Sequence, residues 1–125
     1  MVDQVLAHAR RDHPDECCGV IAAADGVATR LFEMDNAERS PTGFTFDGAE
    51  WLRVYRAMDD ADEEPLVVYH SHTATEAWPS RTDIRWSATA GFPYWLLVST
   101  RAAEDEVRVF TIADGEVTEV ELSLT

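Results

Sequence analysis

The chain has 125 residues and a formal net charge of −14, from 24 acidic residues and 10 basic ones, all of them arginines. This balance argues against nucleic acids and anionic membrane surfaces as partners, because both attract basic protein faces. A hydrophobic content of 46% with 10% aromatic residues is typical of a globular chain. The length predicts one domain over residues 1–125. The acidic surface is either simply solvated or complementary to a basic patch on a partner.

The first third of the chain predicts one helix and one hairpin. Apolar residues recur at helical spacing over residues 3–11, and Pro14 ends this helix because it disfavours helical backbone before it. Residues 18–23 and 27–33 read as two strands. Asp25-Gly26 between them is a tight hairpin turn.

The middle of the chain predicts a loop, a short strand and a second helix. Residues 36–43 are polar and include a proline, which indicates a loop. Residues 44–46 form a short strand in this interpretation. Asp47 can cap a helix that runs to about Asp60. This helix has an apolar side made by Trp51, Val54, Tyr55 and Met58.

The second half of the chain predicts further strands around a third helix. The strands cover residues 65–69, 94–99, 106–112 and 117–122, and Asp114-Gly115 turns the last two into a hairpin. The helix covers residues 81–90, and Gly91 closes it. We therefore expect an α/β (α+β) domain with a mainly antiparallel, curved sheet flanked by helices.

The most informative segment follows the strand at 65–69. His70 and His72 are two residues apart on an extended backbone, so both side chains point to the same face. Asp83 lies in the first turn of the helix that begins after Ser80. Imidazole nitrogens and a carboxylate oxygen are normal zinc ligands, and three protein ligands leave a position open in a catalytic site. His70, His72 and Asp83 are therefore candidate ligands of one zinc ion.

Each part of this pattern is weak when taken alone. A His-x-His pair occurs by chance, and Ser80-x-x-Asp83 is also an ordinary helix-start signal. A zinc deaminase site is excluded because its His-x-Glu and Pro-Cys-x-x-Cys signature is absent. The combination of an apolar strand, two histidines and a capped helix is what favours a metal site.

The two cysteines do not take part in this pattern. Cys17 and Cys18 are adjacent, and neighbouring cysteines rarely form a disulfide because the ring is strained. We expect them to be reduced, buried strand residues. The N-terminus has no secretory signal pattern, so we expect a reducing cytoplasm.

The spacing of these residues resembles the JAMM motif of MPN-plus metallopeptidases. That motif consists of a glutamate, then His-x-His, seven residues and Ser-x-x-Asp. Here it reads Glu16, His70-Ser71-His72 and Ser80-Arg81-Thr82-Asp83, without departure. Residues 8–16, 36–41, 55–63 and 69–83 further resemble the actinobacterial Mec family, which hydrolyses cysteine from the C-terminus of the sulfur carrier CysO.

The resemblance implies a fold and a role for each motif residue. It implies an MPN/JAMM-like domain with one Zn²⁺ on His70, His72 and Asp83. Glu16 would act as general base and then acid. Ser80 would donate a hydrogen bond to the oxyanion in addition to capping the helix. Asp15 competes for the base role, but successive side chains of an extended segment point oppositely, and the resemblance selects Glu16.

The implied partner is a ubiquitin-fold sulfur carrier with a Gly-Gly-Cys tail. A tail of this kind pairs through its backbone, and the segment 40–46 with Phe44 could offer a strand edge, unless it is an ordinary edge strand. Arg81 and Arg85 are candidates for the cysteine carboxylate, or are solvated helix residues. Thr73 and Trp78 lie between the ligands and could shape the mouth of the site.

Two alternatives to this function stay open. One is a JAMM isopeptidase or peptidase that acts on another ubiquitin-like tail. The other is a non-catalytic MPN interaction module. Such modules typically lack part of the ligand set, whereas the whole set is present here.

Overall fold

The computed structural model describes residues 1–124. Its elements follow one another in the order α1 (Val2–Asp12), β1 (Cys18–Ala24), β2 (Val27–Met34), α2 (Gly48–Asp60), β3 (Glu64–His72), α3 (Arg81–Ala90), β4 (Tyr94–Ser99), β5 (Glu106–Ala113) and β6 (Glu116–Val120).

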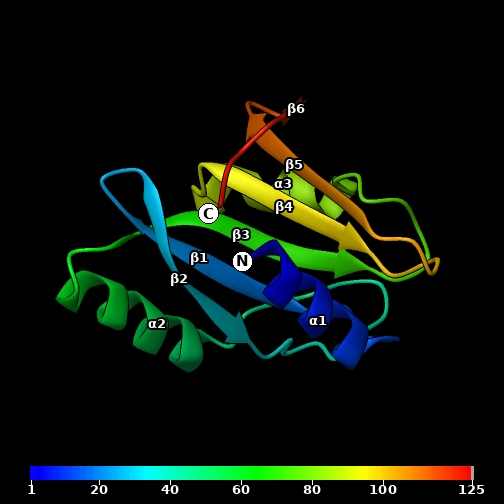
Figure 1. The fold of residues 1–125 in the computed structure, drawn as a ribbon, viewed down its shortest axis with the longest axis horizontal. Coiled ribbons are helices and arrows are strands. Elements are labelled where there is room, and N and C mark those ends of the chain that lie inside the picture. Colours follow the sequence, from blue (N-terminus) through cyan, green and yellow to red (C-terminus); the bar gives the residue numbers. More distant parts are fainter. Residues whose placement is uncertain (125) are drawn as a thin grey trace.

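The strands form one curved sheet in the order β2-β1-β3-β4-β5-β6 (Figure 1). Neighbouring strands are antiparallel except β3 and β4, which run parallel. A parallel pair needs a long crossover, and α3 provides it. The mixed, mainly antiparallel sheet confirms the expected fold class. It places β3, the strand that ends in the histidine pair, in the interior of the sheet.

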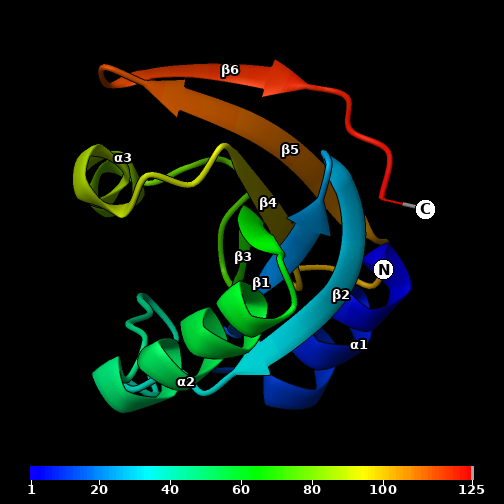
Figure 2. The same cartoon turned by 90° about the vertical axis from the view of Figure 1, so that its left-hand side faces the viewer.

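The two faces of the sheet are covered by different helices. Figure 2 shows α1 on one face and α2 and α3 on the other. Successive side chains of β3 alternate between these faces. Val67 and Tyr69 join the core under α1, whereas Val68 joins a core that Trp86 of α3 helps to cover. His70 and His72 therefore face α2 and α3.

Several local predictions are confirmed. Both hairpin turns have left-handed backbone at two successive residues, with φ of 52° and 77° at Asp25-Gly26 and 53° and 79° at Asp114-Gly115. This is the geometry that matches the twist of the flanking strands. Asp47 caps α2 by accepting a hydrogen bond from Glu50 N. Gly91 ends α3 with a φ of 72°.

Three expectations on element details need correction. The predicted strand at 44–46 is wrong, since only an isolated bridge joins Asn36 and Phe46. The backbone of Thr45 is already engaged: its N–H donates to Asn36 Oδ1 and its carbonyl accepts from Ala37 N. No free strand edge therefore exists at Thr45. On α2, Tyr55 is 49% exposed, and β6 ends at Val120 rather than at residue 122.

The two cysteines are buried, and neither forms a disulfide. Burial raises the pKa of the Cys17 thiol to about 12, which keeps it protonated and unreactive at neutral pH. Among the residues that the structure describes, no helix has the length and apolarity needed to cross a membrane. The cytoplasmic location stays a prediction.

Candidate active site

Three motif side chains converge at the end of β3. The Nε2 atoms of His70 and His72 lie 3.3 Å apart. Oδ2 of Asp83 lies 3.0 Å from Nε2 of His70 and 3.4 Å from Nε2 of His72. All three residues are buried. The sequence expectation that a strand and a helix start bring these donors together agrees with this geometry.

A capping box at the start of α3 brings Asp83 into this position. Ser80 Oγ accepts a hydrogen bond from Asp83 N at 3.1 Å. In return, Oδ2 of Asp83 accepts one from Ser80 N at 2.8 Å. The reciprocal pair fixes the carboxylate at the helix N-terminus, where the helix dipole favours a negative charge. The same carboxylate oxygen faces both histidines.

The hydrogen bonds of His72 leave its Nε2 free to bind a metal ion. Nδ1 of His72 lies 2.8 Å from the carbonyl oxygen of Glu76, which only accepts. When the ring is neutral, its proton is therefore on Nδ1, and Nε2 is the nitrogen left to bind a metal ion. Nδ1 of His70 is different: among buried side-chain nitrogen and oxygen atoms of the described residues, it alone has no hydrogen-bond partner.

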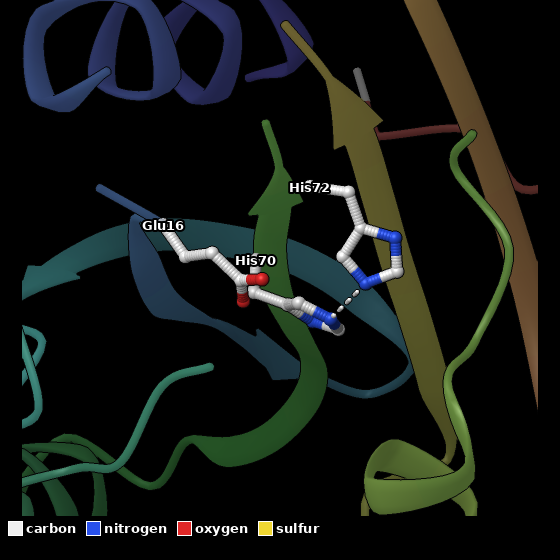
Figure 3. Close-up of side chains that lie close together, drawn as sticks. All are labelled: Glu16, His70 and His72. Atoms are coloured by element: carbon white, nitrogen blue, oxygen red, sulfur yellow. Dashed lines mark hydrogen bonds between the residues drawn. The ribbon is translucent and has the colours of Figure 1, made fainter. Parts of the chain in front are cut away.

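Glu16 reaches the same place from the segment before β1. Figure 3 shows its carboxylate pointing toward the His70 ring. Ligand atoms of Glu16, His70 and His72 all lie within 4.8 Å of one another, and Glu16 is buried. Neither Asp15 nor Asp83 is in this group, but Oδ2 of Asp83 reaches the two histidines from α3.

Hydrogen bonds to the backbone N–H and the backbone carbonyl of Glu16 hold this residue in place. Its N–H donates to the carbonyl of Ser40 at 2.9 Å, and its carbonyl accepts from Nδ2 of Asn36 at 3.0 Å. The next residue, Cys17, donates its N–H to Ser71 Oγ on β3 at 2.8 Å. The carboxylate is therefore held on rigid backbone beside the histidines.

The donors fit a tetrahedral metal ion. Ligands that bind zinc at about 2.0–2.1 Å in a tetrahedron are separated by about 3.3 Å. The spacings of 3.0, 3.3 and 3.4 Å among Nε2 of His70, Nε2 of His72 and Oδ2 of Asp83 are close to this value. Nitrogen and carboxylate donors also suit this ion. The buried group can therefore hold a divalent metal.

The carboxylates of the site have opposite pKa shifts. Burial raises the pKa of Glu16 to about 8; the charge of His72 acts to lower it, and the charges of Asp83 and Glu38 act to raise it further. Burial also acts to raise the pKa of Asp83, but the charge of His70 and the hydrogen bonds from His70, His72 and the Ser80 backbone outweigh it and hold that pKa well below its usual range. Two carboxylates whose pKa values are shifted in opposite directions are typical of a site with separate ligand and proton-transfer roles.

The buried Glu16 predicts a pH-dependent stability difference in the metal-free protein. Its folded pKa is raised, so the folded state binds the proton more tightly and loses stability as the pH rises from about 4.5 to about 8. Glu16→Gln removes this penalty. The chelated variant should therefore match chelated wild type near pH 4.5 and exceed it by about 2–4 kcal/mol at pH 8. Urea unfolding at both pH values measures this difference, and a constant difference would contradict the assignment.

The site opens into a cavity of about 730 Å³ between the segment 41–46, α2 and α3. Glu16, His72, Asp83 and Ser80 lie on its wall. Thr73 and Phe44, which the sequence placed near the substrate, also line it. Arg81, Arg85 and Trp78 are not among its lining residues. Trp78 instead packs on Phe110, under the guanidinium of Arg108.

Sequence reasoning missed Asn36, which joins Glu16 to the cavity wall. Its Nδ2 donates to the carbonyls of Glu16 and Gly43 at 3.0 and 2.8 Å. Its Oδ1 accepts from the N–H groups of Glu38 and Thr45 at 3.0 and 3.2 Å. One buried side chain therefore organises the whole loop. Its four hydrogen bonds to backbone groups are visible only in the folded structure.

Asn36→Ala should lower the free energy of unfolding by about 2–4 kcal/mol, because it leaves several buried backbone groups without a partner. Urea unfolding of the purified variant measures this loss. Arg39→Ala, at an exposed residue of the same loop, is the control and should stay within about 0.5 kcal/mol of wild type. Equal stability of Asn36→Ala and wild type would show that the four bonds are not needed.

The sheet order, the crossover helix and the buried His-His-Asp cluster define a JAB/MPN-type domain. The family model described as prokaryotic homologs of the JAB domain matches residues 1–113, and the chain belongs to this family.

Among curated proteins, the chain is similar to the CysO-cysteine peptidase of Mycobacterium tuberculosis, with 55% identity over 122 residues, 95% of this chain and 83% of that protein. It is 29% identical to the desampylase of Haloferax volcanii over 99 residues, 74% of this chain and 71% of that protein.

Solved structures agree with the fold. A protein of Desulfitobacterium hafniense is 31% identical, with a TM-score of 0.83, and the match covers 99% of this chain and 88% of that one. A JAB1/MPN domain protein from Archaeoglobus fulgidus is 19% identical, with a TM-score of 0.64 over 98% of this chain and 91% of that one. The second likeness concerns the fold alone.

Proposed function

We propose that the chain is a zinc peptidase that hydrolyses the amide between the C-terminal glycine of a ubiquitin-like sulfur carrier and cysteine. The observation that carries this proposal is the convergence of His70, His72 and Asp83 beside Glu16, at an open cavity whose wall includes Glu16, His72 and Asp83. Identity of 55% to a CysO-cysteine peptidase over nearly the whole chain supports the choice of substrate. The complete donor set disfavours a non-catalytic module.

His70, His72 and Asp83 are the proposed metal ligands, and Glu16 is the proposed proton carrier. When bound, zinc supplies a Lewis acid that lowers the pKa of water and polarises a carbonyl group. The three ligand atoms have tetrahedral spacing, and the low pKa of Asp83 keeps it charged. Glu16 is beside this triangle but has a raised pKa, which suits a group that gains and returns a proton.

Each protein group has a defined part in the hydrolysis. An oxygen of the Glu16 carboxylate accepts a proton from the attacking water as the new C–O bond forms at the glycine carbonyl. The Ser80 hydroxyl donates a hydrogen bond to the carbonyl oxygen as negative charge develops there. Glu16 then delivers the proton to the cysteine nitrogen, and the C–N bond breaks. The products are free cysteine and a carrier with its glycine carboxylate restored.

Ser80 is able to cap the helix and to act on the substrate at the same time. Its oxygen accepts from Asp83 N, which leaves the hydroxyl proton free to donate into the cavity. Ser80→Ala removes both roles, whereas Ser80→Gly keeps most of the capping stability.

Both Ser80 variants should therefore lose about 10²–10³-fold in turnover, because an oxyanion donor is absent from each. Only Ser80→Ala should also lose about 1 kcal/mol of stability. Steady-state kinetics and thermal unfolding measure the two effects. Turnover that follows stability alone would assign Ser80 a capping role only.

Intact mass spectrometry tests the proposed function. A sulfur-carrier protein ending in Gly-Gly-Cys is incubated with the zinc-loaded enzyme, with and without a chelator. We expect the loss of one cysteine residue, its abolition by chelation and its recovery on addition of zinc. An unchanged carrier in the presence of bound zinc would overturn this substrate. Cleavage of isopeptide-linked ubiquitin-like proteins instead would favour the activity that the desampylase relative is named for.

A further inference from the structure

Five aromatic side chains form a closed circuit on the cavity wall, which we call the aromatic box: Phe44, Phe46, Trp51, Trp86 and Phe92. Around the circuit, ring centroids lie 5.8 Å apart for Phe44–Phe46, 5.7 Å for Phe46–Trp51, 5.7 Å for Trp51–Phe92, 6.1 Å for Phe92–Trp86 and 5.4 Å for Trp86–Phe44. The rings come from the segment 41–46, from α2 and from the two sides of the α3 C-terminus. Elements far apart in the sequence are therefore needed to build the box.

The aromatic box is continuous with the metal centre. The Phe44 ring stacks on the His70 ring, with centroids 4.5 Å apart and an angle of 26° between the planes. Trp86 is the next ring beyond Phe44. Since the cavity that holds Glu16 and Asp83 is also lined by all five rings, a substrate bound for hydrolysis has a direct path to the box.

All five rings are only half-buried, although each is large enough to contribute to a core. Partly exposed aromatic side chains on the wall of a pocket are typical of ligand sites, because a ligand that covers them removes apolar surface from water, which is favourable. Among the described residues no arginine or lysine lines this cavity, and its acidic wall residues are Glu16, Glu38 and Asp83. The wall therefore disfavours an anionic group, and the open aromatic rings favour an apolar one.

The length of an extended peptide indicates which residue reaches the box. The ring centroids of His70 and Phe44 lie 4.5 Å apart, and those of Phe44 and Trp86 lie 5.4 Å apart. The Trp86 ring is therefore within about 10 Å of the His70 ring, a distance that three extended residues span. Counted back from the cleaved bond, two of these residues are the glycines of the tail. The side chain that reaches the box belongs to the residue one or two positions before Gly-Gly.

The cysteine end of the substrate does not suit the box. Its free carboxylate would meet the electron-rich faces of the rings and lose its hydration. The hydroxyls of Thr73 and Thr82 also line the cavity and can hydrogen-bond a carboxylate. This asymmetry orients the tail, with cysteine on the hydroxyl side and the carrier on the aromatic side.

We propose that the aromatic box is a specificity pocket for an apolar side chain one or two residues before the Gly-Gly of the carrier tail. The inference rests on the proposed function and names the part of the substrate, besides the cleaved bond, that the enzyme recognises. A carrier with leucine at this position should be preferred over one with serine, because a hydrophobic pocket discriminates by about 10- to 100-fold.

The test compares three substrates with four enzymes. The substrates are a carrier-cysteine conjugate with leucine at both positions before Gly-Gly, the same conjugate with serine at both, and the peptide acetyl-Gly-Gly-Cys. The enzymes are wild type, Trp51→Ala, Trp51→Phe and Tyr55→Ala. Tyr55 neighbours Trp51 on α2 but is exposed and is not a lining residue of the cavity, so it is the matched control.

We expect Trp51→Ala to lose about 10- to 100-fold in kcat/KM on the leucine conjugate, mainly through KM. Its kcat/KM on the serine conjugate and on the short peptide should change by less than about threefold. Trp51→Phe should recover most of the loss, and Tyr55→Ala should resemble wild type. Thermal unfolding of each variant confirms that it is folded.

The outcomes separate the pocket from the function. Equal loss on the leucine and serine conjugates, or no loss on either, would overturn the pocket. A comparable loss on the short peptide would place cysteine in the box and would overturn it as well. Failure of wild-type enzyme to hydrolyse any of the three substrates would overturn the proposed function, and the pocket assignment with it.

Discussion

Glu16→Gln should lower turnover by about 10²–10⁴-fold while the protein keeps a full equivalent of zinc. Glutamine has the same shape and can stay in the buried position, but it cannot accept and return a proton. The Glu16 carboxylate lies close to the histidine nitrogens and has a raised pKa, but it is not one of the three proposed ligands. Its loss should therefore remove proton transfer and leave the proposed ligands in place. Single-turnover kinetics on the carrier conjugate and metal analysis of the same sample measure both quantities.

Asp15→Asn is the matched control for this variant. Asp15 precedes Glu16 but is absent from the buried donor group, so its loss should change turnover by less than about threefold. Normal hydrolysis by Glu16→Gln would refute the proton-transfer role. Loss of zinc from Glu16→Gln would show that Glu16 is itself a ligand.

His72→Ala should abolish hydrolysis because the protein no longer retains the metal ion. The Nε2 lone pair of His72 is held toward Asp83 by the bond from Nδ1 to Glu76, so alanine removes a pre-oriented ligand. Zinc content after dialysis should fall close to zero. Chelation should lower the melting temperature of wild type, since metal that binds the folded state stabilises it, and should leave that of His72→Ala unchanged.

His13→Ala controls for the removal of a histidine. His13 is exposed, and its Nδ1 contacts the Thr100 hydroxyl rather than the metal centre. This variant should keep its zinc and its activity. A His72→Ala protein that retains a full equivalent of zinc and turns over would rule out the proposed ligand set.

Local rules predicted the parts of the site that depend on neighbouring residues. The period of a strand is enough to place His70 and His72 on one face, and a capping box is enough to place Asp83 in the first turn of α3. The two left-handed turns at Asp25-Gly26 and Asp114-Gly115 follow from the few residue pairs that adopt this backbone. In each case the interactions span only a few residues.

The parts that depend on distant contacts were not accessible in this way. Nothing near Asn36 in the sequence indicates that its side chain bonds four backbone groups, because two of these groups, the carbonyls of Glu16 and Gly43, are distant in the sequence. The choice of Glu16 over Asp15 needed the family motif, since alternation alone allows either. The prediction of a strand at Phe44 and Phe46 failed because it rested on their aromatic side chains alone. Their rings pack against Trp86, which is distant in the sequence.

The most direct test of the central claim is a crystal structure of the zinc-loaded protein with anomalous data collected at the zinc edge. We expect one strong anomalous peak at about 2.0–2.2 Å from Nε2 of His70, Nε2 of His72 and Oδ2 of Asp83, with the Glu16 carboxylate outside bonding distance. A peak bonded to Glu16 but not to Asp83 would reverse the proposed roles of the two carboxylates. The absence of a peak at this cluster in zinc-loaded crystals would contradict the metal centre itself.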